Sequence, residues 1–242
     1  MPRACRLVLR GAALVSLLVL VLQRPAMAQD QEGGTWFAFQ AYGNPGSSEQ
    51  LKRRWKWWFD TQGRFFERNA DNVGVVRPGI GYTLSDRSTV WMGYALLRSF
   101  PQKAGPFNEH RFWQQYTWEE RNGFKTLFAQ SRLEQRFDDR GDDVGWRFRQ
   151  FFRWTTPIVG DQPWNQNWSL RVWNELFFDL NETDWGQDPG LSENRFFAGF
   201  GFHPDPENDL TLEIGYVNQL LRREDTDDGM NHIIGTTLLW TR

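Results

Sequence analysis

Hydrophobic and polar residues alternate along most of the chain with the two-residue period of a β-strand. Between residues 109 and 137, for example, Phe112, Tyr116 and Trp118 fall on one face, and charged or amide side chains fall on the other. Successive side chains of a strand point to opposite sides, so each segment has an apolar and a polar face. The segments exceed the roughly five or six residues usual in globular proteins and match the length that a membrane-spanning β-barrel needs.

The pattern predicts an all-β fold, a closed antiparallel transmembrane β-barrel of about 10–12 strands. Turn residues separate the segments, and Asn122-Gly123 is the dipeptide best suited to a tight hairpin. Eleven strand-like segments are indicated: Thr35–Gly43, Trp55–Arg64, Val73–Leu84, Thr89–Phe100, His110–Glu120, Lys125–Phe137, Val144–Pro157, Asn167–Leu180, Arg195–His203, Leu210–Leu220 and His232–Trp240.

The strand number and the connections carry further expectations. From the third segment on, short connections (85–87, 122–123) alternate with long ones (101–109, 181–194, 222–231), as in bacterial outer-membrane barrels. Single-chain bacterial barrels have even strand numbers. We therefore expect ten or twelve wall strands with both termini periplasmic. Either the first segment lies outside the wall, or one strand has been merged or missed.

Arginine recurs on the polar faces of neighbouring segments, with glutamate or aspartate beside it. A soluble β-sandwich would also alternate, but its polar face meets water and needs no such pairing. These rows suit a barrel lumen in which ions pair across strands. We expect a lumenal ion-pair network that fixes strand register, formed by Arg77, Arg111, Glu119, Arg132, Glu134, Arg136, Arg147, Arg149, Arg171 and Glu175.

The same charged rows bear on whether the barrel is open. About eight strands already leave room only for side chains, so ten or twelve strands enclose a narrow interior. We expect a largely filled lumen and, at most, a small conductance. Glycines inside the strands, such as Gly79 and Gly93, would relieve curvature or make room for lumenal side chains.

Residues 1–28 have the features of a cleaved secretory signal peptide. Three arginines precede an apolar run at 11–22, and Ala26-Met27-Ala28 supplies a cleavage site. Residues 29–242 would then form one outer-membrane barrel domain in a Gram-negative cell. Cleavage removes Cys5, the single cysteine, so the mature chain has no disulfide. It also leaves 24 Lys and Arg against 30 Asp and Glu, a balance that gives no indication of nucleic-acid binding.

Candidate chemistry is sparse. His110, His203 and His232 stand in no metal-ligand spacing, so we expect no metal, no cofactor and no catalytic residue. Two alternatives stay open. An enzyme that modifies outer-membrane lipid would need a serine beside His110 or His232. A binder of surface glycan would use the loop-side residues Trp164, Trp168 and Trp185.

A series of motifs resembles the domain of unknown function 2490 family of predicted outer-membrane β-barrels. The resemblance spans residues 36–240. It implies the barrel fold and an outer-membrane location, hence contact with outer-membrane lipid and insertion by the barrel-assembly machinery. It implies no activity, so the sequence favours a structural or narrow small-solute barrel whose solute is unidentified. The motifs are Arg77-Pro78-Gly79, Gly81-Tyr82, Gly93-Tyr94, Arg111 with Trp113-Gln114-Gln115, Arg132 with Glu134-Gln135-Arg136, and Arg147 with Arg149.

Overall fold

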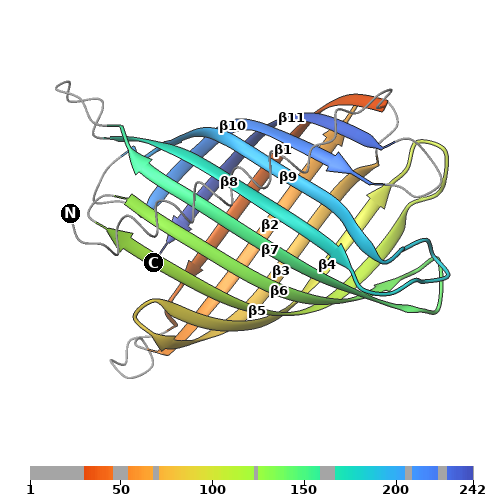
Figure 1. Cartoon of the computed structure of the whole chain (residues 1–242), viewed down its shortest axis with the longest axis horizontal. Helices are drawn as coiled ribbons and strands as arrows, with labels where there is room; N and C mark the ends of the chain where they lie inside the picture. Colours follow the sequence, from red (N-terminus) through yellow and green to blue (C-terminus); the bar gives the residue numbers. More distant parts are fainter. Residues whose placement is uncertain are drawn as a thin grey trace.

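The computed structural model describes residues 30–45, 54–67, 71–122, 125–158, 167–204, 209–222 and 228–241. The expected signal peptide at 1–28 lies outside them. The described chain closes into one barrel (Figure 1). Its strands are β1 (Asp30–Gly43), β2 (Trp55–Phe66), β3 (Asn72–Ser85), β4 (Ser88–Phe100), β5 (Phe107–Asn122), β6 (Lys125–Asp138), β7 (Val144–Pro157), β8 (Trp168–Asp179), β9 (Gly190–Phe202), β10 (Leu210–Leu221) and β11 (Gly229–Thr241). Among the described residues, no helix is long and apolar enough to cross a membrane.

Strand β1 closes the barrel. It pairs antiparallel with β2 and parallel with β11, whereas all other neighbours are antiparallel and follow chain order. All eleven predicted segments are therefore wall strands, and the expectation of ten or twelve is wrong. The closing pair is parallel rather than antiparallel. A parallel pair still satisfies the edge groups of both strands, so closure does not require an even number.

The parallel closure also separates the two ends of the described chain. Because β1 and β11 run in the same direction, Asp30 and Thr241 lie at opposite ends of the barrel. The expectation that both termini share one side is therefore wrong for these residues. We call the end with connection 86–87 and the close of β11 the turn end. The opposite end, with connections 101–106, 139–143 and 180–189, is the loop end.

Strand boundaries agree with the sequence pattern to within a few residues except at two N-termini. Strand β1 begins at Asp30 instead of Thr35, and β9 begins at Gly190 instead of Arg195. Glycine or polar residues hide the alternation there, and a register shift at Phe177 and Phe178 interrupts the pairing of β9 with β8. The alternation of short and long connections also ends after β7, because 158–167 and 180–189 are both long.

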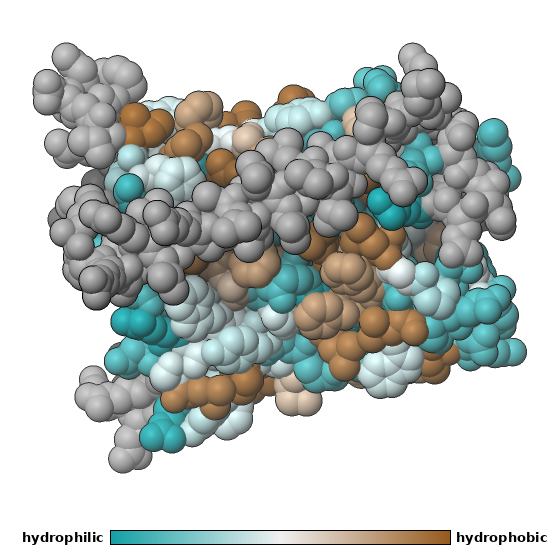
Figure 2. All heavy atoms as spheres, in the orientation of Figure 1, coloured by the Kyte–Doolittle hydropathy of each residue, from teal (hydrophilic) through white to brown (hydrophobic). Residues whose placement is uncertain are grey.

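The outward face of the wall is apolar between the strand ends. Exposed side chains such as Val76, Met92 and Ile234 point away from the lumen. Figure 2 shows apolar residues over the middle of the visible wall and hydrophilic residues gathered at its right-hand end. Outward amides near the middle bond to one another, as Gln114 does with Gln135 at 3.0 Å. Such pairing satisfies polar groups without solvent.

Trp113 shows how the wall receives a large lumenal side chain. Its indole, 0% exposed, lies against Gly79 and Gly93, which are paired across β3 and β4. A Cβ atom would lie 2.5 Å from the ring at Gly79 and 2.3 Å at Gly93. The expectation that these glycines make room for lumenal side chains is thus confirmed. Around the indole lies an apolar cluster of Val75, Trp91, Ala95 and Leu97.

We expect Gly93→Ala to lower the unfolding temperature of the protein in detergent, measured by heat-modifiable gel mobility. Its methyl group would also lie 2.4 Å from the Pro78 carbonyl oxygen, and overpacking of this kind costs about 1–3 kcal/mol. Gly74→Ala is the matched control, because a Cβ there meets nothing within 4 Å. Equal effects of the two substitutions would contradict the packing of Trp113.

Candidate functional site in the barrel lumen

A cluster of buried charges fills the lumen in the half nearer the loop end. Each member occupies an inward position of its strand, and ion pairs of 4.0 Å or less join the members into one set. We call it the charge cluster. It comprises Glu109, Arg111, Arg132, Glu134, Arg136, Arg147, Arg149, Glu175, Asp179, Glu193 and Arg195.

Glu134 lies at the centre of the charge cluster. Its carboxylate is 2.6 Å from Arg149, 3.4 Å from Arg111 and 3.5 Å from Arg132, and the residue is 1% exposed. Arg132 and Arg149 face each other across β6 and β7, where like charges would repel. The Glu134 carboxylate pairs with both arginines and offsets the repulsion between them, which stabilises this register. Arg132 also stacks on the Trp113 ring, 4.7 Å from its centroid.

Further carboxylates carry the cluster around the barrel. Glu175 on β8 accepts two bonds from Arg149, at 2.6 and 3.0 Å. Arg195 on β9 donates to Glu193, which also accepts a bond from Gln219 on β10. Gln219 in turn accepts a bond of 3.1 Å from Asn231 on β11. Together with the 4.0 Å ion pair between Glu175 and Arg195, these hydrogen bonds link the lumenal faces of β5 to β11.

The β8–β9 connection packs over the loop end of the charge cluster. The side-chain carbonyl of Gln187 accepts a 2.9 Å bond from Arg136, and its amide donates to the backbone oxygens of Trp146 and Asn181. The Trp185 ring stacks on Arg136 at 4.9 Å, and its N–H donates to the Asp143 carbonyl at 2.8 Å. The connection thus adds a cap of buried side chains over the ions.

The structure brings seven of the ten sequence-predicted residues into the charge cluster and places three elsewhere. Arg77 pairs with Asp60 at 2.5 Å, and Arg171 pairs with Glu213 at 3.3 Å; both are buried lumenal pairs. Glu119 pairs with the exposed Arg121 at the turn end. Four cluster members were not predicted from the sequence: Glu109, Asp179, Glu193 and Arg195. The two-residue strand period places each of them on the polar face. It does not indicate which partner each would meet.

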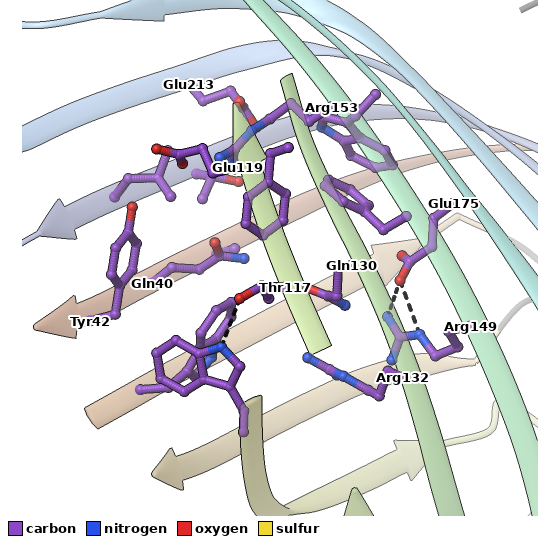
Figure 3. A pocket seen from close by; sticks show the side chains of 18 of the residues that line it. Gln40, Tyr42, Thr117, Glu119, Gln130, Arg132, Arg149, Arg153, Glu175 and Glu213 are labelled. Atoms are coloured by element: carbon purple, nitrogen blue, oxygen red, sulfur yellow. Dashed lines mark hydrogen bonds and ion pairs between the residues drawn. The ribbon is translucent and has the colours of Figure 1, made fainter. Parts of the chain in front are cut away.

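The half of the lumen nearer the turn end contains a cavity of about 700 Å³. Its mouth includes Ser85, Asp86 and Arg87 around the β3–β4 turn, and its inner end reaches Arg64, Arg132, Arg149 and Arg195. Figure 3 shows Arg149 and Glu175 near its base, with Tyr42 and Glu213 on the far side of the space. The expectation of a largely filled lumen therefore describes one half of the barrel, and the alternation pattern did not predict the cavity.

Aromatic side chains line one wall of this cavity as a continuous series. Phe128, Phe151, Trp173 and Phe197 come from β6, β7, β8 and β9 and all line the space. Ring centroids are 6.0, 5.6 and 5.1 Å apart in that order, and the last two rings are stacked at 6°. We call this series the aromatic wall. Such rings offer apolar surface with faces and edges for a ligand.

Cations outnumber carboxylates around the cavity. Nine lining residues are Lys or Arg, and four are Asp or Glu. Three of the carboxylates are already paired, with Arg121, with Arg149 and with Arg171. Arg64 and Arg153 have no carboxylate within 4.0 Å among the residues that the structure describes. The cavity therefore combines an apolar wall with surplus positive charge.

The residues of the two alternative functions lie elsewhere. His110 and His232 face outward from β5 and β11 and bond to the hydroxyls of Tyr94 and Tyr216 instead of a serine. His203 bonds to Thr211 at 2.9 Å; burial lowers its pKa, and nearby Arg171 lowers it further.

The tryptophans proposed for glycan contact do not form one site. Trp185 is buried in the cap, Trp168 packs edge-on or tilted against Phe200 and Phe202, and Trp164 lies outside the described residues. In the described ranges, no group of three or more His, Cys, Asp or Glu side chains could hold a metal ion.

A family model described as "Protein of unknown function (DUF2490)" matches residues 34–230. The chain belongs to this family. An uncharacterized protein of Methylorubrum extorquens is 32% identical over 166 residues, which cover 68% of this chain and 70% of that relative. No solved structure matches the chain.

We expect Glu134→Ala to destabilise this DUF2490 protein by about 3–5 kcal/mol, because three arginines would lose a buried counter-ion. The unfolding temperature in detergent measures the effect. Glu120→Ala is the control: its partner Arg87 is 61% exposed, so that pair contributes at most about 1 kcal/mol. Equal losses would mean that Glu134 does not hold the register of the charge cluster.

Proposed function

We propose that this protein is an outer-membrane barrel that holds a small solute in its lumenal cavity and does not form an open pore. The observation that carries the proposal is the cavity of about 700 Å³, which lies within the size range of small-molecule sites. It opens at the turn end, and its inner end reaches the charge cluster at Arg132, Arg149 and Arg195.

Membrane insertion is supported by the distribution of residue types. Outward positions are mostly aromatic or aliphatic, inward positions carry the charges, and outward amides such as Asn174 and Asn194 bond to each other. A soluble barrel would reverse this order. The signal-peptide features of residues 1–28 and the closed sheet agree with insertion in the outer membrane.

A blind lumen is supported by what occupies the other half. The charge cluster occupies it, and beside the cluster lies the fully buried Trp113 with its apolar neighbours Val75, Ala95 and Leu97. The Trp185 and Gln187 cap covers the loop end of the ions. A solute that enters the cavity therefore meets packed side chains instead of a continuous channel.

Cysteine accessibility tests this arrangement, because the expected mature chain has no cysteine. We expect Ala38→Cys, which lines the cavity, to react with a small methanethiosulfonate in purified protein. Leu97→Cys, buried in the apolar cluster beside Trp113, should stay protected until the protein is unfolded. Labelling is measured by mass spectrometry after equal reagent exposure.

Two outcomes would contradict the proposal. Rapid labelling of Leu97→Cys in the folded barrel would mean that the filled half is open to solvent. Protection of both cysteines would mean that the cavity is not accessible to solutes. Cell fractionation provides the membrane test: the protein is expected in the outer membrane, and recovery of folded protein in the soluble periplasmic fraction would contradict insertion.

A further inference from the structure

The base of the cavity holds two guanidinium groups against one indole ring. Arg64 lies 4.2 Å and Arg195 5.1 Å from the Trp36 ring. Arg195 has a carboxylate partner in Glu193, whereas Arg64 donates to the neutral Gln62 at 2.8 Å. Two guanidinium groups near one ring concentrate positive charge there, and only Arg195 has a carboxylate partner among the described residues. An anion beside Arg64 would balance that charge.

Unpaired hydrogen-bond donors point to the same ligand chemistry. Eight buried side-chain atoms in the described chain have no hydrogen-bond partner there, and six of them are nitrogen donors. Four of these six donors are on residues that line the cavity: Trp36, Trp58, Arg64 and Arg153. Buried donors require acceptors, and carboxylate or phosphate oxygens accept without donating. The residues that line the cavity therefore have more unpaired buried donors than unpaired buried acceptors.

The aromatic wall lies next to this base. Phe197 forms part of an apolar cluster against which both Trp173 and Trp36 pack. The aromatic wall is therefore contiguous with the base that holds Arg64 and Arg195. A ligand with its charged group beside Arg64 would lay an apolar body along Phe197, Trp173 and Phe151. A free inorganic ion would leave this surface unused.

We infer that the lumenal cavity binds an amphipathic organic anion, whose oxyanion group lies beside Arg64 and whose apolar body packs on the aromatic wall. This inference rests on the proposed solute-binding function and specifies its ligand class. Carboxylates and phosphates share the required chemistry: an oxyanion that accepts several hydrogen bonds.

Three probes with one apolar body and different head groups test the inference. They are 4-phenylbutyrate, 4-phenylbutanol and 4-phenylbutylamine, titrated calorimetrically into the full barrel in lipid nanodiscs. We expect the carboxylate to bind about tenfold tighter than the alcohol and the amine to bind weakest, because only an ionised acceptor makes charge-assisted hydrogen bonds with a guanidinium group. Inorganic phosphate should bind more weakly than phenyl phosphate, which shares its head group.

Variants locate the head group. Arg64→Gln should remove most of the preference for carboxylate over alcohol while binding of the alcohol persists. If Arg64→Gln does not fold, Trp36→Phe retains a ring, removes one unpaired donor and should weaken the carboxylate selectively. Arg98→Gln, on the exposed outer wall, should leave all affinities unchanged.

The outcomes separate this inference from the function on which it rests. Equal binding of carboxylate and alcohol would overturn the anion assignment while leaving solute binding intact. A carboxylate preference that survives both Arg64→Gln and Trp36→Phe would place the head group elsewhere and overturn the site. Absence of binding by every probe, with Ala38→Cys still accessible, would count against the inferred ligand class. Absence of binding with Ala38→Cys protected would overturn the proposed function itself.

Discussion

The buried position of Glu134 among three arginines is the constraint on which the rest of the lumen depends. Strand register places Arg132 directly opposite Arg149, an arrangement that is unfavourable without a shared carboxylate. A shift of one residue in β6 would turn Glu134 to the outer face and bring apolar side chains into the lumen. Charge pairing and the apolar outer face therefore specify the same register.

The division of the barrel into a filled half and a hollow half follows from where bulky and charged side chains fall along the strands. Trp113 fits against Gly79 and Gly93 only near the middle of the barrel, and the ions lie from there toward the loop end. Toward the turn end, small residues such as Ala38, Thr117 and Gly235 line the space. Eleven strands enclose more volume than these side chains fill, so a cavity is left.

Much of the wall could be predicted from the sequence, because a two-residue period depends only on neighbours along the chain. That period gave all eleven strands and the inward direction of Arg132, Glu134 and Arg149. Glu175 was also expected in the network, and it contacts Arg149 at 2.6 Å. The prediction of an even strand number was wrong. It followed the empirical rule for single-chain bacterial barrels, whereas this barrel closes by parallel pairing of β1 with β11.

Other parts of the site depend on distances that alternation cannot supply. Asp179 lies directly opposite Arg147, Glu109 meets Arg136 diagonally, and Arg136 reaches Asp179 across β7. These contacts depend on the pairing registers of β5 to β8. Trp185 and Gln187 come from a connection, where no period applies. The cavity depends on side-chain volumes summed around the whole barrel, so no single strand predicts it.

The central claim is that packed, paired charges close one half of the lumen. Single-channel recording in planar bilayers tests it most directly. The purified barrel should give no large, stable conductance steps. A general porin reconstituted in the same way should conduct and serves as the positive control. Reproducible large steps from folded protein, verified by heat-modifiable mobility, would mean that ions pass through the charge cluster and would contradict a blind lumen.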